Sequence, residues 1–218
     1  MFLYEPPPDV GLDILYEDDC LLIVNKPSGL LSVPGRGDDK QDCMISRVQS
    51  THPSALIVHR LDMSTSGILV LALDKVTHRE LSQQFQERKV SKQYIAIVAG
   101  KPELNEGLID KSMICDWPNR PKQIIDDEQG KQAQTGYKVL EHFTQDNTSR
   151  LLLTPITGRT HQLRLHCQFI GHPIVGDQLY ADSKTKKMAK RLLLHSANIS
   201  FEHPKTHEGI NIACPSPF

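Results

Sequence analysis

The chain reads ALIVHRLDMSTSGILVLAL at residues 55–73. Both ends of this segment are aliphatic and rich in β-branched residues, which is typical of short buried strands. The middle, His59 to Gly67, contains Ser, Thr and Gly residues that favour a bend in the chain. The pattern therefore predicts two strands joined by a turn, with Asp62 in the turn and Arg60 two positions before it.

A carboxylate in such a turn has two interpretations. Asp62 could form the turn by accepting hydrogen bonds from backbone N–H groups, as Asp commonly does. Alternatively, it could be a nucleophile or base that a rigid scaffold presents. The segment by itself favours Asp62 as a turn-former. Motifs elsewhere in the chain favour a catalytic role instead.

The amino-acid composition limits the classes of protein to which the chain can belong. The chain has 218 residues, 39% of them hydrophobic and 23% charged, and a formal net charge of -1. These values are typical of a globular protein with one core, and the near-neutral total argues against indiscriminate binding of polyanions. No apolar stretch reaches membrane-spanning length and the N-terminus has no secretion-signal pattern, so we expect a cytoplasmic protein without a membrane partner. The five cysteines are scattered and contain no Cys-x-x-Cys pair, which favours reduced thiols.

The pattern along the chain predicts a mixed α/β or α+β domain with a largely antiparallel sheet. We expect an extended lead-in at residues 1–13 and a single domain at residues 14–218. Expected strands lie at residues 14–16, 21–25, 55–58, 68–73, 92–99, 107–109, 135–140, 150–153, 192–194 and 198–201. Expected helices begin near Asp42, a plausible N-cap, and lie at residues 77–89 and 161–170, while residues 115–123 are expected to form a loop.

The helix expected at residues 161–170 has an apolar stripe and a polar one. On a 3.6-residue period Leu163 and Cys167 share the apolar stripe, and Arg164 lies on the polar one. We therefore expect the helix to bury one side and to offer a polar side, which carries Arg164. Its guanidinium is either an ordinary surface group or the partner that keeps a carboxylate such as Asp62 ionised and oriented.

Other candidate residues also allow two interpretations. Lys92 and Tyr94 lie two apart on an expected strand and so share a face. The tyrosine could stack on a planar base or be an ordinary residue at the edge of the core. Lys186 and Lys187 belong to a basic segment that is either a solvated helix or a patch that contacts phosphates.

Metal and nucleotide cofactors are not indicated. His161 and His166 are five residues apart, unlike the i, i+4 pair that a zinc site on a helix uses. Phosphate-loop and dinucleotide-binding patterns are missing as well. We expect neither a metal site nor a nucleotide cofactor.

Several motifs together resemble the RluA family of RNA pseudouridine synthases. The resemblance spans nearly the whole chain, in order, and rests on the motifs VNKPSGL at residues 24–30, HRLD at 59–62, TSG at 65–67, KQY at 92–94, PITGRTHQLR at 155–164, GHPIVGD at 171–177 and LH at 194–195. The loop at residues 115–123 resembles that of the small, dual-specificity members, which act on 23S ribosomal RNA and transfer RNA.

The resemblance implies a pseudouridine-synthase fold and specific residue roles. Asp62 would be the catalytic aspartate, Tyr94 would stack beside the target uracil, and Arg164 would pair with the aspartate. Arg60 would correspond to a residue that enters the RNA where the flipped base has left. The remaining substrate-binding candidates are His59, Lys92, Arg159, Lys186 and Lys187.

The reaction that the family resemblance implies is isomerisation of uridine in structured RNA, such as 23S rRNA or the tRNA anticodon stem-loop. Asp62 could attack the sugar, attack the ring or remove a sugar proton, and the sequence does not choose among these routes. The resemblance also implies an enzyme that needs no metal or organic cofactor, and we expect it to be a monomer. Because little chain precedes the first expected strand, we expect no S4-like RNA-binding module.

Two other functions are compatible with parts of the pattern. A glycoside hydrolase also breaks a bond at an anomeric carbon, but it normally needs two carboxylates, and Asp116 or Asp177 would have to supply the second. In a non-catalytic RNA-binding module, Asp62 would be a turn-former only.

Overall fold

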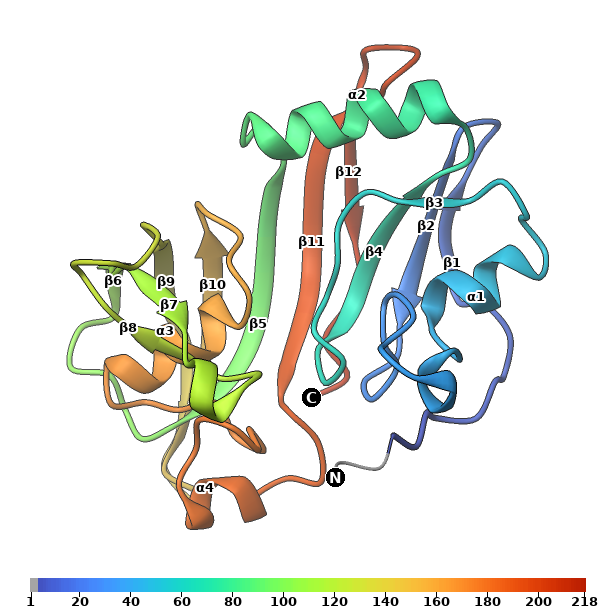
Figure 1. Cartoon of the computed structure of the whole chain (residues 1–218). Helices are drawn as coiled ribbons and strands as arrows, with labels where there is room; N and C mark the ends of the chain where they lie inside the picture. The colour runs from blue at the N-terminus through green and yellow to red at the C-terminus, as the bar shows by residue number, and fades with distance from the viewer. Residues whose placement is uncertain (1–3) are drawn as a thin grey trace. The chain divides into compact units, whose positions relative to one another are not determined.

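The computed structural model describes residues 4–218, so the first three residues of the predicted lead-in lie outside it (Figure 1). The chain divides into two compact units. The first unit contains the chain up to Lys92 together with Ser196–Pro217, and the second contains Gln93–His195 and Phe218. The predicted single catalytic domain at residues 14–218 stays a prediction. Within residues 4–218 no helix is both long and apolar enough to cross a bilayer.

The first unit is built on a sheet with the strand order β1-β2-β4-β11, in which β2 runs antiparallel to both β1 and β4. The short β3 also pairs with β4, and β12 pairs with β11. The strands are β1 (Ile14–Glu17), β2 (Leu21–Lys26), β3 (Leu56–Ile57), β4 (Ser66–Ala72), β11 (Leu194–Glu202) and β12 (Gly209–Ala213). All of β4 and nearly all of β2 are buried, which explains why both are continuous apolar runs without polar alternation.

One helix of the unit packs on this sheet, and two shorter helices lie in the segment between β2 and β3. Helix α2 (Lys75–Gln86) packs against β3 and β4, with Leu81 fully buried (Figure 1). A short 3-10 helix, η1 (Asp38–Lys40), and helix α1 (Met44–Gln49) lie between β2 and β3 in the chain. The hydrophobic core of the unit includes Leu21, Ile23, Ile68, Val70, Leu81, Ile199 and Phe201.

The second unit has an antiparallel sheet with the order β5-β10-β9-β6. These strands are β5 (Ser91–Ala99), β6 (Glu106–Asp110), β9 (Gln134–Phe143) and β10 (Thr148–Pro155). A separate hairpin contains β7 (Met113–Cys115), the 3-10 turn η2 (Trp117–Asn119) and β8 (Gln123–Ile125). Helices α3 (Gln162–Phe169) and α4 (Ser183–Lys187) complete the unit. The fold class is α+β, as predicted.

Two local predictions were wrong, and a third was incomplete. The helix near Asp42 begins after Cys43, whose backbone N–H donates to Ser46 Oγ at 3.0 Å, while Asp42 bonds Arg47. The loop expected at residues 115–123 is confirmed as the connection between β7 and β8, but the two strands themselves were not predicted. The two strands expected at residues 192–194 and 198–201 are one strand, β11, and its partner β12 was not predicted.

Candidate active site

Asp62 lies in the turn between β3 and β4, as predicted, and is half-buried. The turn is closed by a hydrogen bond of 3.0 Å from Thr65 N–H to the carbonyl of Asp62. Two serines from the segment after β2 also hold it. Ser28 Oγ donates to the carbonyl of Ser64 at 2.7 Å, and Ser32 Oγ donates to the carbonyl of Leu61 at 2.8 Å. The backbone around Asp62 is therefore fixed by other side chains.

Lys26 adds a third brace to this turn. The side chain is fully buried, and its Nζ donates to the carbonyls of Pro27 at 2.8 Å, Leu30 at 2.7 Å and Met63 at 3.2 Å. A buried ammonium is stable only when its donors are satisfied, and three carbonyl oxygens match the three N–H donors of lysine. The lysine of the VNKPSGL motif thus joins the segment after β2 to the Asp62 turn.

Gly67 follows the turn at the start of β4. Its φ is +108°, and a Cβ at this position would overlap the backbone of Ser196. Only glycine combines this backbone conformation with such a close approach. The glycine of the TSG motif therefore sets how the chain enters β4.

His59 and Lys92 were predicted to bind substrate, and the described contacts of both lie inside the first unit. His59 Nε2 accepts a hydrogen bond of 3.0 Å from Val70 N–H, and its ring stacks on Phe85 with the centroids 4.7 Å apart. Lys92 Nζ lies 5.8 Å from the centroid of the same phenyl ring. Burial, together with the charge of Lys92, lowers the pKa of His59 to about 3, so the imidazole is neutral at physiological pH. A contact of either residue with RNA stays a prediction.

Arg164 on α3 is buried, which corrects the prediction that this side of the helix is exposed. Its side chain is about 5% exposed, and Nε and Nη2 each lie 2.7 Å from one oxygen of Asp177. Gln162 and His166 on the same helix are buried too, and both have hydrogen-bond partners. The interpretation of Arg164 as a surface residue is therefore wrong, because a charged side chain can be buried when it is paired and hydrogen-bonded.

Sequence reasoning did not identify Asp177 as the partner of Arg164. Its carboxylate is fully buried and also accepts hydrogen bonds from the backbone N–H groups of Leu179 and Tyr180, at 2.8 and 3.2 Å. Burial alone would raise the pKa of Asp177, but the hydrogen bonds and charge of Arg164 outweigh it and lower the pKa. The carboxylate is thus ionised and committed to Arg164, which makes it a poor general acid.

The other predicted site residues of the second unit occupy different environments. Tyr94 is 9% exposed and pairs with Leu153 across β5 and β10. Arg159 is exposed before α3, and its Nε donates to the carbonyl of Gln132 at 3.2 Å. Lys186 is half-buried and Lys187 is exposed on α4. In the first unit, Arg60 is exposed next to the Asp62 turn.

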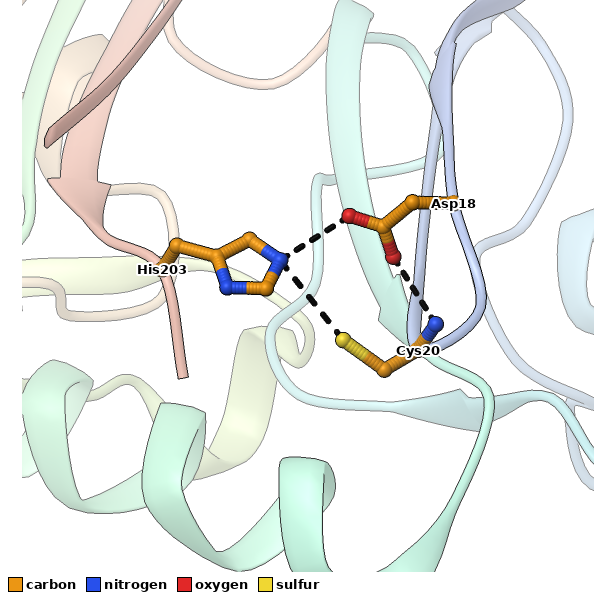
Figure 2. A group of neighbouring side chains, drawn as sticks. All are labelled: Asp18, Cys20 and His203. Carbon is orange, nitrogen blue, oxygen red and sulfur yellow. Dashed lines mark hydrogen bonds and ion pairs between the residues drawn. The ribbon is translucent and has the colours of Figure 1, made fainter. Parts of the chain in front are cut away.

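Among residues 4–218, one group has the composition of a metal site: Asp18, Cys20 and His203. Figure 2 shows His203 Nε2 between Asp18 Oδ2, at 2.9 Å, and Cys20 Sγ, at 3.6 Å. His203 Nδ1 accepts backbone N–H bonds from Lys205 and Thr206, so the ring hydrogen is assigned to Nε2. If Nε2 bound a metal, it would lose this hydrogen, and the neutral ring would carry its hydrogen on Nδ1 instead. Nδ1 faces two backbone N–H donors, so a hydrogen on it would be opposed by both. The donor set therefore fits a closed hydrogen-bond cluster better than a metal centre.

Sequence comparison assigns the class. The family model described as RNA pseudouridylate synthase matches residues 20–169. The chain belongs to this family. The enzyme is thus an isomerase that acts on RNA. This membership excludes the glycoside hydrolase and the non-catalytic RNA-binding module as alternatives.

Individual relatives place the chain more narrowly. It is 52% identical over 215 residues to the dual-specificity RNA pseudouridine synthase RluA of Escherichia coli (strain K12), covering 99% of this chain and 98% of the relative. The protein of the same name from Yersinia pestis is 50% identical over 205 residues, which is 94% of this chain and 99% of that protein. Among solved structures, human RNA Pseudouridylate Synthase Domain Containing 1 matches with a TM-score of 0.81 and 32% identity, covering 98% of this chain and 87% of that one.

Proposed function

We propose that this enzyme converts specific uridines to pseudouridine in structured RNA: in 23S rRNA, in the anticodon stem-loop of tRNA, or in both. The near-complete coverage of the dual-specificity relative from Escherichia coli supports this choice of substrates. The motifs of the Asp62 turn, β5 and α3 support the reaction.

Asp62 is the proposed catalytic aspartate. The observation that supports this role is that Lys26, Ser28 and Ser32 hold the turn of Asp62 through hydrogen bonds to its backbone carbonyls. Because these three side chains fix the backbone of the turn, the Asp62 side chain extends from a rigid scaffold. Following the family resemblance, Tyr94 stacks beside the target uracil and Arg164 pairs with the aspartate.

The proposed reaction breaks the N1–C1′ bond of uridine and forms a C5–C1′ bond after the uracil has turned in the site. The hydrogen on C5 is lost as a proton and N1 gains one, so nothing is added or removed overall. The anionic Asp62 acts as nucleophile or base. Since a stacked uridine hides its glycosidic bond, the nucleotide must first flip into a pocket, and Arg60 is proposed to enter the RNA where the base has left.

We further propose that the enzyme works in the cytoplasm as a monomer, with residues 14–218 as one catalytic domain. His59, Lys92, Arg159, Lys186 and Lys187 are proposed to contact the RNA. The isomerisation is redox-neutral and transfers no group to a second substrate, which supports a reaction without a nucleotide cofactor.

Release of tritium from RNA labelled at uracil C5 tests the proposal. The purified enzyme is expected to release tritium to water, and Asp62→Asn is expected to abolish release because the amide is neither an anion nor a base. Asp146→Asn, at an exposed position between β9 and β10, is the matched control and should retain the wild-type rate. Circular dichroism and RNA binding establish that the variants are folded. Wild-type rates in Asp62→Asn would refute the role of Asp62.

A further inference from the structure

Trp117 is an exposed aromatic side chain in a well-defined turn. It is the only tryptophan in the chain, and 66% of it is exposed. Tryptophan buries a large apolar area in most folded proteins, so strong exposure calls for an explanation. The residue lies in η2, the turn of the β7–β8 hairpin.

Hydrogen bonds hold the turn in one conformation. Asp116 N–H donates to the carbonyl of Lys122 at 3.0 Å, and Lys122 N–H donates to the carbonyl of Asn119 at 3.1 Å. Asn119 Nδ2 donates to Asp116 Oδ2 at 3.0 Å. The exposed indole is therefore presented on an ordered scaffold, which lowers the entropic cost of binding a ligand.

Arg120 lies beside the indole. Its guanidinium carbon is 4.7 Å from the centroid of the Trp117 ring, within the range of a cation–π contact. Arg120 is itself exposed. The pair thus offers an aromatic face and a positive charge, the two features that proteins use to hold unpaired nucleotides through base stacking and phosphate contact.

The end of the hairpin next to the turn is connected to Arg164 through Tyr180. Gln123 N–H donates to the hydroxyl of Tyr180 at 2.8 Å, and this hydroxyl also bonds His161 Nδ1 at 2.9 Å. The Tyr180 ring lies 5.3 Å from the guanidinium carbon of Arg164. One tyrosine therefore contacts both the hairpin and the arginine that we propose to act in the reaction.

We propose that Trp117 and Arg120 form a subsite in which an unpaired base of the RNA substrate stacks on the indole. This inference rests on the proposed function, which supplies a substrate with exposed loop bases. RNA is the occupant that the observations favour, because the indole is accompanied by a cation and its hairpin shares Tyr180 with Arg164. A protein partner on the same surface is the outcome that would contradict the subsite.

The intrinsic fluorescence of the protein tests the subsite, because Trp117 is the only indole. A synthetic RNA hairpin with a tRNA anticodon-arm sequence is titrated into the Asp62→Asn enzyme, which prevents turnover during the titration. Stacking of a base on the indole should quench its emission as the RNA saturates. Filter binding with the same RNA should give an affinity about tenfold weaker for Trp117→Ala, in line with the loss of about 1.4 kcal/mol of stacking.

Two further variants sharpen the test. Trp117→Phe keeps an aromatic face and should bind more tightly than Trp117→Ala. Leu104→Ala removes an apolar side chain that is also 66% exposed, and it should bind like the wild type. If Trp117→Ala binds RNA as tightly as the wild type, the subsite is wrong whatever the emission does. Should that variant not fold, unquenched emission at saturating RNA is the contradicting result.

The tritium assay separates the two proposals. If the wild-type enzyme releases tritium but Trp117→Ala has unchanged affinity, the subsite fails and the proposed function stands. If the wild-type enzyme releases no tritium from either RNA substrate, the proposed function itself fails.

Discussion

Arg164 and Asp177 illustrate how one buried pair positions a functional group. Both side chains are almost fully buried, and two nitrogens of the guanidinium each bond one carboxylate oxygen. This bidentate geometry fixes the plane of the guanidinium. Asp177 is therefore a positioning residue for Arg164.

Asp177→Asn should reduce kcat by at least tenfold with little change in KM. The amide has one acceptor oxygen, and its NH₂ group would face a guanidinium N–H, so Arg164 would lose its fixed orientation. Loss of a buried charge partner should also lower the free energy of unfolding by about 3 kcal/mol. Steady-state kinetics at a temperature where the variant is folded measure the first effect, and urea unfolding measures the second.

Asp182→Asn is the control for this substitution. Asp182 caps α4 through backbone N–H bonds from Lys184 and Thr185, a role that asparagine can also fill. Its kcat should match the wild-type value. A wild-type kcat in Asp177→Asn, with only the stability reduced, would mean that the pair is purely structural.

The sequence predicted the turn of Asp62 but not the environment of Arg164. The turn is encoded locally, by apolar strands on both sides and a glycine at the bend. The burial of Arg164 depends on Asp177, thirteen residues further along the chain, and periodicity counts an arginine as polar whether or not it has a buried partner. The proposed catalytic role of Asp62 rests on the family motifs, because turn chemistry alone favoured a structural role.

At the level of elements, strands were predicted correctly where complete burial requires a continuous run of apolar residues. Strands β2 and β4 are buried on both faces, so their apolar runs stand out. The β7 and β8 strands have three residues each and are stabilised by packing on Leu165 and Tyr180. Such tertiary contacts leave no periodic pattern in a short segment, so the loop between the two strands was predicted but the strands were not.

Helix α4 gives a test of electrostatic binding. The Asp182 cap at its N-terminus explains why the lysine-rich segment is helical. The helix would have the same structure whether its lysines face solvent only or contact phosphates of RNA, so the structure does not choose between these two interpretations. If Lys186 and Lys187 contact phosphates, the double variant Lys186→Glu, Lys187→Glu should bind RNA more weakly. The slope of log K against log salt should also become shallower, by about 0.7–0.9 for each phosphate that the variant no longer neutralises.

A double variant elsewhere on the surface separates local binding from total charge. Lys101→Glu with Lys138→Glu changes the net charge by the same amount at two exposed positions. It should affect binding and salt dependence less than the α4 variant does. Equal losses of affinity in both variants would assign the effect to net charge alone.

For the molecule as a whole, the neutral state of His59 predicts a loss of stability in mild acid. Its pKa is about 3 in the folded chain and about 6.5 in an unfolded one. Between these values the unfolded chain binds more protons, so the free energy of unfolding falls as the pH falls from about 6.5 towards 3. The lowered pKa values of Asp18 and Asp177 add further losses only below about pH 4.

Urea unfolding at pH 7.5 and pH 5 measures this effect. The wild-type protein should lose about 1–2 kcal/mol more than His59→Gln between the two pH values, because glutamine can still accept the Val70 N–H bond but does not titrate. His207→Gln, at a side chain that is 74% exposed, should follow the wild-type profile. Parallel profiles for wild type and His59→Gln would show that His59 is protonated without penalty.

The enclosed ammonium of Lys26 is not available to pair with a phosphate of RNA. The formal net charge of -1 includes this lysine, but its side chain is fully buried and Nζ donates to backbone carbonyls inside the protein. The cations that can touch a phosphate are therefore fewer than the lysines and arginines of the chain. Because the net charge is close to zero, long-range attraction also does little to draw a polyanion towards this protein. Complexes with most RNAs of a cell should therefore dissociate quickly. Only an RNA loop whose phosphates fit the few exposed cations should stay bound for longer.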